Sequence, residues 1–379
     1  MKELFLKEIS LYIHIPFCKQ KCLYCDFPSY SGKEKFISGY IDALNKEIKD
    51  KASSYKIKSI FIGGGTPSYL DEIELEKLLK CINTLTLGEN LEFTIECNPG
   101  SLSEDKLKIM KKYNVNRISM GLQSTKPSLL KEIGRIHTFE EFENNYLLAR
   151  KVGFKNINID LMFGLPNQSV EDWRKTLEKI IEFNPEHISA YSLIIEEGTC
   201  FCNLYNQDKL NLPSEEKERD MYLLTKKILK ENGYSQYEIS NFSKDKKECY
   251  HNIVYWQLNE YLGLGVSSSS YIEGKRIKNI DDIELYIKNI NSNESVENEI
   301  YENNINDDME EFMFMGLRMI RGIEERDFKE RFKKDIDEVY GDVIYKNIKQ
   351  ELLIRNGGRI YLTSRGIEVS NSVMSDFII

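Results

Sequence analysis

The chain has 379 residues, of which 41% are hydrophobic and 30% are charged, and its formal net charge is −9 at pH 7. This composition is typical of a folded globular protein, and the acidic excess argues against broad electrostatic binding of nucleic acid. No apolar run reaches the roughly 18 residues of a membrane span, and the opening MKELFLKEIS lacks the apolar core of a signal peptide. We therefore expect a cytoplasmic protein with no nucleic-acid partner.

Short apolar runs alternate with amphipathic stretches along the first half of the chain. This alternation predicts βα units and a parallel sheet. We expect an α/β fold in which residues 1–230 form a partial (βα)6 barrel of the TIM type. The predicted strands cover residues 11–15, 59–62, 92–95, 117–120, 156–161 and 187–192.

Helix starts can also be identified between these strands. A helix is expected near residues 34–50, Ser103 is expected to cap another, and Ser169 with Asp172 resembles a capping box. A further helix is expected near 214–232, where Pro213-Ser214 precedes it.

The pattern changes in the second half of the chain. An aromatic-rich stretch lacks clear periodicity, and an Asn- and Glu-rich stretch follows it that is nearly free of large apolar residues. The end of the chain predicts helices and a strand near 359–363, which together suggest a small winged-helix-like domain. We therefore expect an irregular extension at 231–290, a linker at 291–306 and a mostly helical C-terminal domain at 307–379.

Three of the eight cysteines, Cys18, Cys22 and Cys25, lie together on the loop after the first predicted strand. Thiolates at this C-x3-C-x2-C spacing can hold a [4Fe–4S] cluster while one iron lacks a protein ligand. The amino and carboxylate groups of S-adenosylmethionine (SAM) can chelate such an iron. The alternative is a zinc site in a binding protein, with His14 or Asp26 as the fourth ligand.

The cysteine motif resembles that of the radical SAM superfamily. Further motifs make nearly the whole chain similar to the oxygen-independent coproporphyrinogen III oxidase group of that superfamily. These motifs are Tyr12-x-His14-Ile-Pro-Phe-Cys18, Gly63-Gly-Gly-Thr66-Pro67, Glu96-Cys-Asn98-Pro99, Ser119-Met-Gly121-Leu-Gln123, Gly134-Arg135-x-His137 and Asn158-x-Asp160-Leu-Met-x-Gly164-Leu-Pro166.

The resemblance implies a SAM site at the C-terminal ends of the strands, where βα barrels carry their active sites. Glycines 63–65 would let the backbone approach the cofactor closely, although a plain tight turn is the alternative. The residues that the resemblance assigns to SAM are Tyr12, Tyr24, Gly64, Gly65, Thr66, Glu96, Gln123, Arg135, Asp160 and Ile194.

Two features differ from the oxidase pattern. Phe27 stands where the oxidases carry a further cysteine, and only ten residues precede Leu11, where the oxidases have a longer arm. Cys25-Asp26-Phe27 and His251-Asn252-Ile-Val-Tyr255-Trp256 instead resemble the heme chaperone branch of the group, the HemW family.

This branch implies a protein that binds heme and passes it to an acceptor protein, which the sequence does not identify. The alternative is the oxidase reaction, in which a SAM-derived radical attacks the propionates of coproporphyrinogen III. An electron donor is needed if SAM is cleaved, and peripheral membrane contact stays open. The expected cofactors are a [4Fe–4S] cluster, SAM and heme.

His251 is the candidate heme ligand, because an imidazole can bind heme iron. Tyr255 and Trp256 would add aromatic surface for the porphyrin. The alternative is that His251 makes buried hydrogen bonds and Trp256 fills the core.

Overall fold

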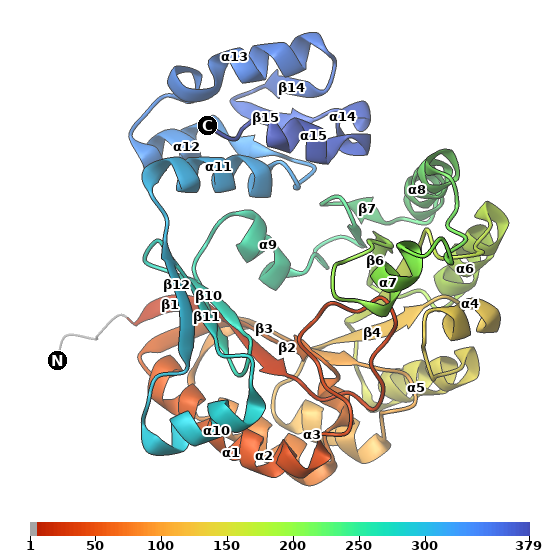
Figure 1. Ribbon diagram of the computed structural model, residues 1–379, viewed down its shortest axis with the longest axis vertical. Helices are drawn as coiled ribbons and strands as arrows, with labels where there is room; N and C mark the ends of the chain where they lie inside the picture. Colours follow the sequence, from red (N-terminus) through yellow and green to blue (C-terminus); the bar gives the residue numbers. More distant parts are fainter. Residues whose placement is uncertain (1–5) are drawn as a thin grey trace.

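Six parallel strands form the centre of the molecule, which a computed structural model describes for residues 6–379 (Figure 1). Each strand pairs in parallel with the next one in the chain. Five of them contain the whole predicted segment, and β5 begins one residue after the predicted start at 156, so the partial barrel is confirmed. The strands are β1 (Lys7–Ile15), β2 (Tyr55–Gly64), β3 (Thr86–Cys97), β4 (Arg117–Gln123), β5 (Ile157–Phe163) and β6 (His187–Ser192). Residues 1–5, part of the opening segment that the sequence predicts not to be a signal peptide, lie outside the described residues.

Helices follow the strands and cover the outer face of the sheet. Ser103 accepts a hydrogen bond from Lys106 N, and Ser169 with Asp172 forms a capping box, as predicted. The helices are α1 (Ile37–Ala52), α2 (Glu72–Ile82), α3 (Glu104–Lys112), α4 (Pro127–Glu132), α5 (Phe139–Val152), α6 (Val170–Glu182), α7 (Cys200–Tyr205) and α8 (Glu215–Glu231).

The two faces of the strands differ in chemistry because successive side chains point to opposite sides. In β1, Leu11, Ile13 and Ile15 are fully buried in the hydrophobic core that includes residues of α1. Ser10 and Tyr12 alternate with them and point the other way. The inner face of the barrel is therefore polar, and its groups need partners.

The extension at 231–290 is regular, which corrects the prediction of an irregular segment. Strand β9 (Tyr261–Leu264) pairs in parallel with β1 and continues the sheet beyond its edge. The remaining elements are β7 (Ser235–Gln236), β8 (Asn241–Ser243), α9 (Tyr250–Trp256), β10 (Ser269–Ile272), β11 (Lys275–Asn279) and α10 (Ile283–Ser292).

The predicted linker at 291–306 also contains regular structure. Strand β12 (Glu297–Glu302) pairs antiparallel with β11 at the edge of the twelve-stranded sheet. Every residue of β12 is exposed. A strand without a buried face has no apolar alternation, so the sequence carried no signal for it.

The C-terminal module, residues 305–379, contains a three-stranded antiparallel sheet in the order β13-β15-β14, and its hydrophobic core also includes Leu258 and Tyr271 of the extension. This agrees with the predicted mostly helical, winged-helix-like domain. Its elements are α11 (Ile305–Gly316), β13 (Ile323–Glu324), α12 (Glu325–Phe332), α13 (Ile336–Lys349), β14 (Leu353–Asn356), β15 (Arg359–Leu362), α14 (Ser364–Glu368) and α15 (Ser370–Ser375).

The module is attached to the extension by backbone pairing. Ile239 N donates to Arg318 O at 3.2 Å, and Ile320 N donates to Tyr237 O at 3.0 Å. Helix α9 lies between the module and the six central strands (Figure 1). The module and α9 therefore face each other.

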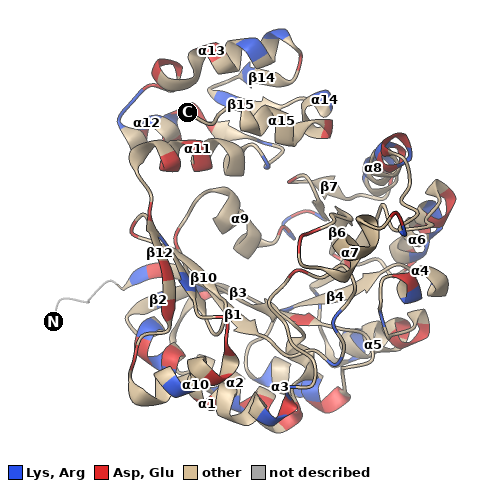
Figure 2. Ribbon diagram, in the orientation of Figure 1, with Lys and Arg blue, Asp and Glu red and all other residues tan. Residues whose placement is uncertain are grey.

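Charged residues of both signs are interspersed along the outer helices (Figure 2). Within residues 6–379, no helix is both long enough and apolar enough to cross a membrane.

A buried carboxylate joins α1 to the extension. Glu47 is 1% exposed and accepts hydrogen bonds from Gly265 N at 2.8 Å, Tyr286 Oη at 2.6 Å and Asn279 Nδ2 at 3.0 Å. A single side chain therefore satisfies buried donors from three segments of the extension.

We expect Glu47→Ala to destabilise the fold strongly. A buried donor that loses its acceptor costs about 1–3 kcal/mol, so three such donors should lower the free energy of unfolding by about 3 kcal/mol or more. Urea unfolding followed by circular dichroism measures this loss. The control Asp50→Ala, at an exposed position of the same helix, should change the value by less than about 0.5 kcal/mol. Equal losses in the two variants would contradict the expected role of Glu47.

Candidate functional site

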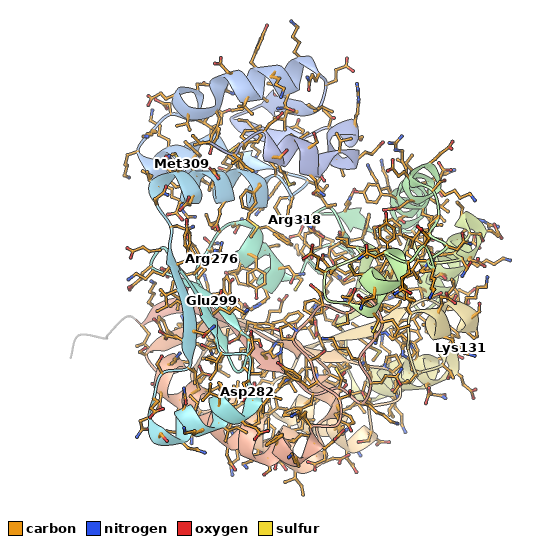
Figure 3. All side chains as sticks on the ribbon, viewed as in Figure 1. Lys131, Arg276, Asp282, Glu299, Met309 and Arg318 are labelled. Atoms are coloured by element: carbon orange, nitrogen blue, oxygen red, sulfur yellow. The ribbon has the colours of Figure 1, made fainter. Side chains whose placement is uncertain are left out.

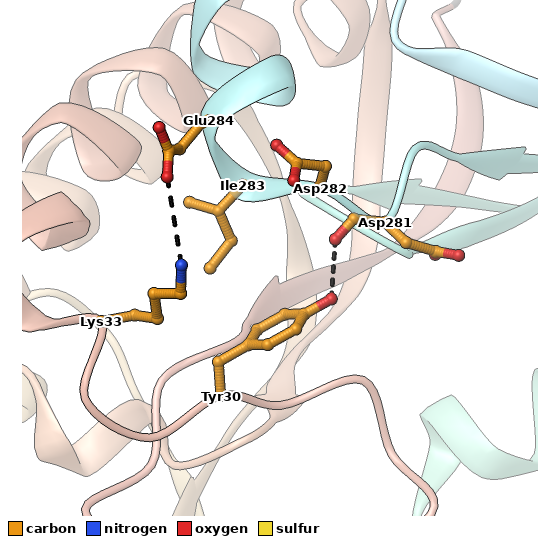
Figure 4. Close-up of a pocket in the computed structure, with 6 residues that line it drawn as sticks. All are labelled: Tyr30, Lys33, Asp281, Asp282, Ile283 and Glu284. Carbon is orange, nitrogen blue, oxygen red and sulfur yellow. Dashed lines mark hydrogen bonds and ion pairs between the residues drawn. The ribbon is translucent and has the colours of Figure 1, made fainter. Parts of the chain in front are cut away.

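The base of the cysteine loop is closed by backbone hydrogen bonds. Tyr30 N donates to Pro16 O at 2.7 Å, and Cys18 N donates to Tyr30 O at 3.0 Å. The Tyr30 hydroxyl donates to Asp281 O at 2.7 Å, beside a surface cavity of about 260 Å³ (Figure 4). Cys18 is thus fixed both to the barrel and to the segment before α10.

The tip of the loop is held by two other segments. Leu23 N donates to Ile133 O at 3.1 Å, and Phe201 N donates to Leu23 O at 3.0 Å. Leu23 and Tyr24 pack against a small hydrophobic cluster that contains Ile133 and Phe201. The loop therefore has a defined shape although it contains no helix or strand.

The three cysteines are free thiols; Cys18 is buried, and Cys22 and Cys25 are partly exposed. Burial raises the pKa of Cys18 and of Cys25. A bound metal reverses this effect, because a coordinating thiol is deprotonated. Three unpaired thiols on one fixed loop fit a [4Fe–4S] cluster, in which each thiolate binds a different iron.

His14, one of the two candidate fourth ligands of a zinc site, is engaged in the barrel, because its Nδ1 accepts from Tyr12 Oη at 2.9 Å and its Nε2 donates to Pro28 O at 2.7 Å. Burial lowers the pKa of His14 to about 4.

His14 also explains one residue of the glycine loop. Gly64 has a φ of +107°, and a Cβ at this position would lie 2.3 Å from Cε1 of His14. The glycine is therefore required by a close contact as well as by its backbone conformation.

A chain of hydrogen bonds links the cysteine loop to the barrel. Thr66 Oγ1 lies 3.4 Å from Cys18 Sγ and accepts from Asn98 Nδ2 at 2.9 Å. Arg135 Nη1 donates to Asn98 Oδ1 at 2.8 Å, and Arg135 Nη2 donates to Tyr24 Oη at 3.1 Å. These five residues connect the two ends of the loop through the segments that follow β2, β3 and α4.

Arg135 has one donor that is not used by the hydrogen bonds to Asn98 and Tyr24. Its Nε is buried and has no hydrogen-bond partner among the described residues. A cavity of about 620 Å³, here called the loop cavity, is lined by Cys22, Thr66, Asn98 and Arg135, among others. A guanidinium in this position is suited to hold a carboxylate such as that of SAM.

Two carboxyl groups lie close together in a second cavity of about 210 Å³, the interior cavity, which Tyr12 and Gly64 also line. Burial, and next the charge of Asp160, raise the pKa of Glu96 from 4.5 to about 8. Ser119 and Asn158 donate to the two oxygens of Asp160 at 2.9 and 2.7 Å. A cationic group placed here would favour ionised Glu96, so the pair suits the ammonium or sulfonium of SAM.

The predicted SAM residues divide between these two cavities. Tyr12, Gly64, Glu96 and Asp160 line the interior cavity, and Thr66 and Arg135 line the loop cavity with Cys22. Neither cavity is lined by the other four, Tyr24, Gly65, Gln123 and Ile194.

Three of those four still lie at the site. Tyr24 is bonded to Arg135, Gly65 N donates to Ile15 O at 2.8 Å, and a Cβ on Gly121 would touch both Arg135 and Gln123. Ile194 is different, because it follows β6 and is 67% exposed.

His251 does not present a free imidazole in this structure, and its assignment as the heme ligand stays a prediction. Its Nδ1 lies 2.8 Å from Ser59 Oγ, and its Nε2 lies 2.8 Å from Tyr255 Oη. The ring is 1% exposed and stacks on Phe61, and burial lowers its pKa to about 3. The structure has the arrangement of the alternative, in which His251 makes buried hydrogen bonds.

Residues that the sequence did not assign to the site also line the interior cavity. Arg117 and Asn158 each lie two residues before a polar side chain of the same strand face, Ser119 and Asp160. His187 holds Asn158 through a 2.6 Å contact between Nδ1 and Oδ1. Polar residues at a spacing of two within a buried strand were the signal for this set.

Comparison with known proteins identifies two parts of the chain. A model of the radical SAM superfamily matches residues 12–180, and a model of the HemN C-terminal domain matches residues 305–369. The chain is 40% identical to Heme chaperone HemW of Lactococcus lactis subsp. lactis (strain IL1403), covering 98% of each chain. It is 38% identical to Heme chaperone HemW of Bacillus subtilis (strain 168), covering 97% of this chain and 99% of the other.

A solved structure shares the complete architecture. Coproporphyrinogen III oxidase (HemN) from Escherichia coli matches with a TM-score of 0.86, covering 100% of this chain and 91% of the other. The identity is 22%, so this likeness shows the fold alone.

We expect Cys22→Ala to prevent assembly of the [4Fe–4S] cluster, because only two thiolates would remain on the loop. Anaerobic reconstitution followed by iron and sulfide analysis and visible absorption measures the loss. Cys202→Ala removes a thiol of similar exposure outside the loop and should keep the wild-type content. Tight zinc binding in place of iron by the wild type would contradict this assignment.

The raised pKa of Glu96 predicts a pH-dependent stability in the cofactor-free protein. Between pH 4.5 and about 8 the folded state keeps a proton that the unfolded chain has lost. The free energy of unfolding should therefore fall with rising pH in this window, and Glu96→Gln should remove that fall. Urea unfolding of both proteins across the window tests this.

The control for this pH series is Glu140→Gln, at an exposed position of α5. It should leave the pH dependence of the wild type unchanged. Parallel curves for the wild type and Glu96→Gln would show that the carboxyl is not neutral in the folded state.

Proposed function

Because the chain belongs to the HemW family of heme chaperones, we propose that it binds heme and passes it to an acceptor protein. The observation that carries this proposal is the family relationship over nearly the whole chain, including the segment Tyr250–Trp256 and the C-terminal module. The acceptor is a protein partner, and the heme is the cargo.

The radical SAM part of the chain implies a [4Fe–4S] cluster and SAM. In our proposal Cys18, Cys22 and Cys25 hold the cluster, and when bound it supplies one-electron chemistry. Arg135 orients the SAM carboxylate, and Glu96 beside Asp160 faces the positively charged part of SAM. An electron donor is a further partner if SAM is cleaved.

The dimensions of the interior cavity favour carriage of heme over the oxidase reaction. Its volume is about 210 Å³, whereas pockets for drug-sized ligands have roughly 300–1,000 Å³. His251 and Tyr255 of α9 and Phe27 of the cysteine loop line it and limit its size. The limited size of this cavity is the reason that we place the heme outside the barrel.

We expect the cluster-loaded protein to bind heme at a saturable stoichiometric site, detected as a shift of the Soret band in an anaerobic titration. The same protein with SAM, a reductant and coproporphyrinogen III should yield no protoporphyrinogen IX. An authentic coproporphyrinogen oxidase is the positive control for the second assay. Turnover of coproporphyrinogen, or absence of heme binding, would contradict the proposed function.

A further inference from the structure

Two further cavities lie between the C-terminal module and α9, and they share Trp256 and Asn259 as lining residues. The larger has a volume of about 360 Å³ and is also lined by Phe312 and Met319. The smaller has a volume of about 230 Å³. We call them the junction cavities.

Aromatic and thioether side chains make up much of their walls. The smaller cavity is lined by Tyr255, Tyr261, Tyr271 and Met315, together with Trp256. Helix α11 contributes to both cavities, through Met315 in the smaller one and through Phe312 and Gly316 in the larger one. Such walls suit a large, flat, apolar ligand.

Trp256 is the central residue of these walls, and its indole nitrogen lacks a hydrogen-bond partner among the described residues. The Arg318 guanidinium carbon lies 4.5 Å from the centre of the indole ring. Trp256 Nε1 and Arg318 Nε are both buried and have no hydrogen-bond partner among residues 6–379. Figure 3 shows Arg318 in the space between the module and α9. A buried polar pair of this kind is usually bonded when its site is complete.

Three arginines line the larger cavity, and two of them have no acidic partner within residues 6–379. Arg321 makes no ion pair or side-chain hydrogen bond among the described residues. Arg331 donates a hydrogen bond to Tyr271 Oη at 3.3 Å. Arg359 is paired with Glu324.

The two acidic residues that line this cavity, Glu324 and Asp327, are already paired with other arginines. Glu324 also accepts from Arg326 at 3.4 Å, and Asp327 lies 3.7 Å from the same guanidinium. Two arginines beside an apolar wall therefore remain for an anionic ligand. Guanidinium groups bind carboxylates through paired, charge-assisted hydrogen bonds.

We propose that the junction cavities form the heme site, with the porphyrin against Trp256 and its two propionates on Arg321 and Arg331. This inference rests on the proposed function and names where the cargo is held. The two cavities, of about 360 and 230 Å³, adjoin at Trp256 and Asn259, and they combine aromatic side chains with two arginines that have no acidic partner among the described residues. The site lies between the HemN C-terminal domain and the extension that carries α9.

The test compares single charge reversals within the same domain. Arg321→Glu and Arg331→Glu change the proposed site, and Arg365→Glu is the matched control. Arg365 is exposed on α14, lines neither junction cavity and makes no ion pair in the described chain. Each protein is loaded with cluster anaerobically, checked by circular dichroism, and titrated with heme and with heme dimethyl ester, whose propionates carry no charge.

We expect Arg321→Glu and Arg331→Glu each to raise the dissociation constant for heme about ten-fold or more. Arg365→Glu should bind heme as the wild type does. The affinity for the dimethyl ester should be nearly equal in all four proteins, because the arginines act on the propionate charges.

The other outcomes distinguish failure of the proposed heme site from failure of the proposed chaperone function. Heme binding by the wild type with no difference among the three variants would overturn the site and leave the chaperone proposal standing. Equal weakening for heme and for its ester would overturn the propionate contacts. Absence of heme binding by the wild type would overturn the function and the site together.

Discussion

Every polar group on the inner face of the six strands needs a partner, and the rest of the structure follows from this constraint. A buried polar group without a hydrogen bond costs more than the bond itself contributes. Glu92 of β3 finds its partners in the backbone of α9, where it accepts from Tyr250 N and His251 N at 2.9 Å each. Ser59 of β2 is satisfied by Ser10 and by His251. Helix α9 is thus held in place by the same strand face that it covers.

The central fold could be predicted because its pattern is strong. Buried strands with apolar runs, and helix caps such as Ser103 and Ser169, leave local signals that do not depend on distant contacts. Strand β12 could not be predicted, because it is defined by pairing with β11 and has no buried face. The same limit applies to α9, whose position depends on Glu92, far away in the sequence.

The site was predictable to a similar extent. Cys18, Cys22 and Cys25 share one loop, so their spacing alone identified them. Asn98 was part of a motif, but its role as the link between Thr66 and Arg135 depends on three separate segments, which follow β2, β3 and α4. His251 shows the opposite limit: a motif identified the residue, while its buried contacts decide what the ring does.

Tyr255 lies at the boundary between the barrel and the C-terminal module. Its side chain lines both the interior cavity and the smaller junction cavity, and its hydroxyl bonds to His251. The compartment of the barrel and the compartment under the C-terminal module therefore share the ring of Tyr255 as part of their walls. A displacement of that ring would change the shape of both chambers at once.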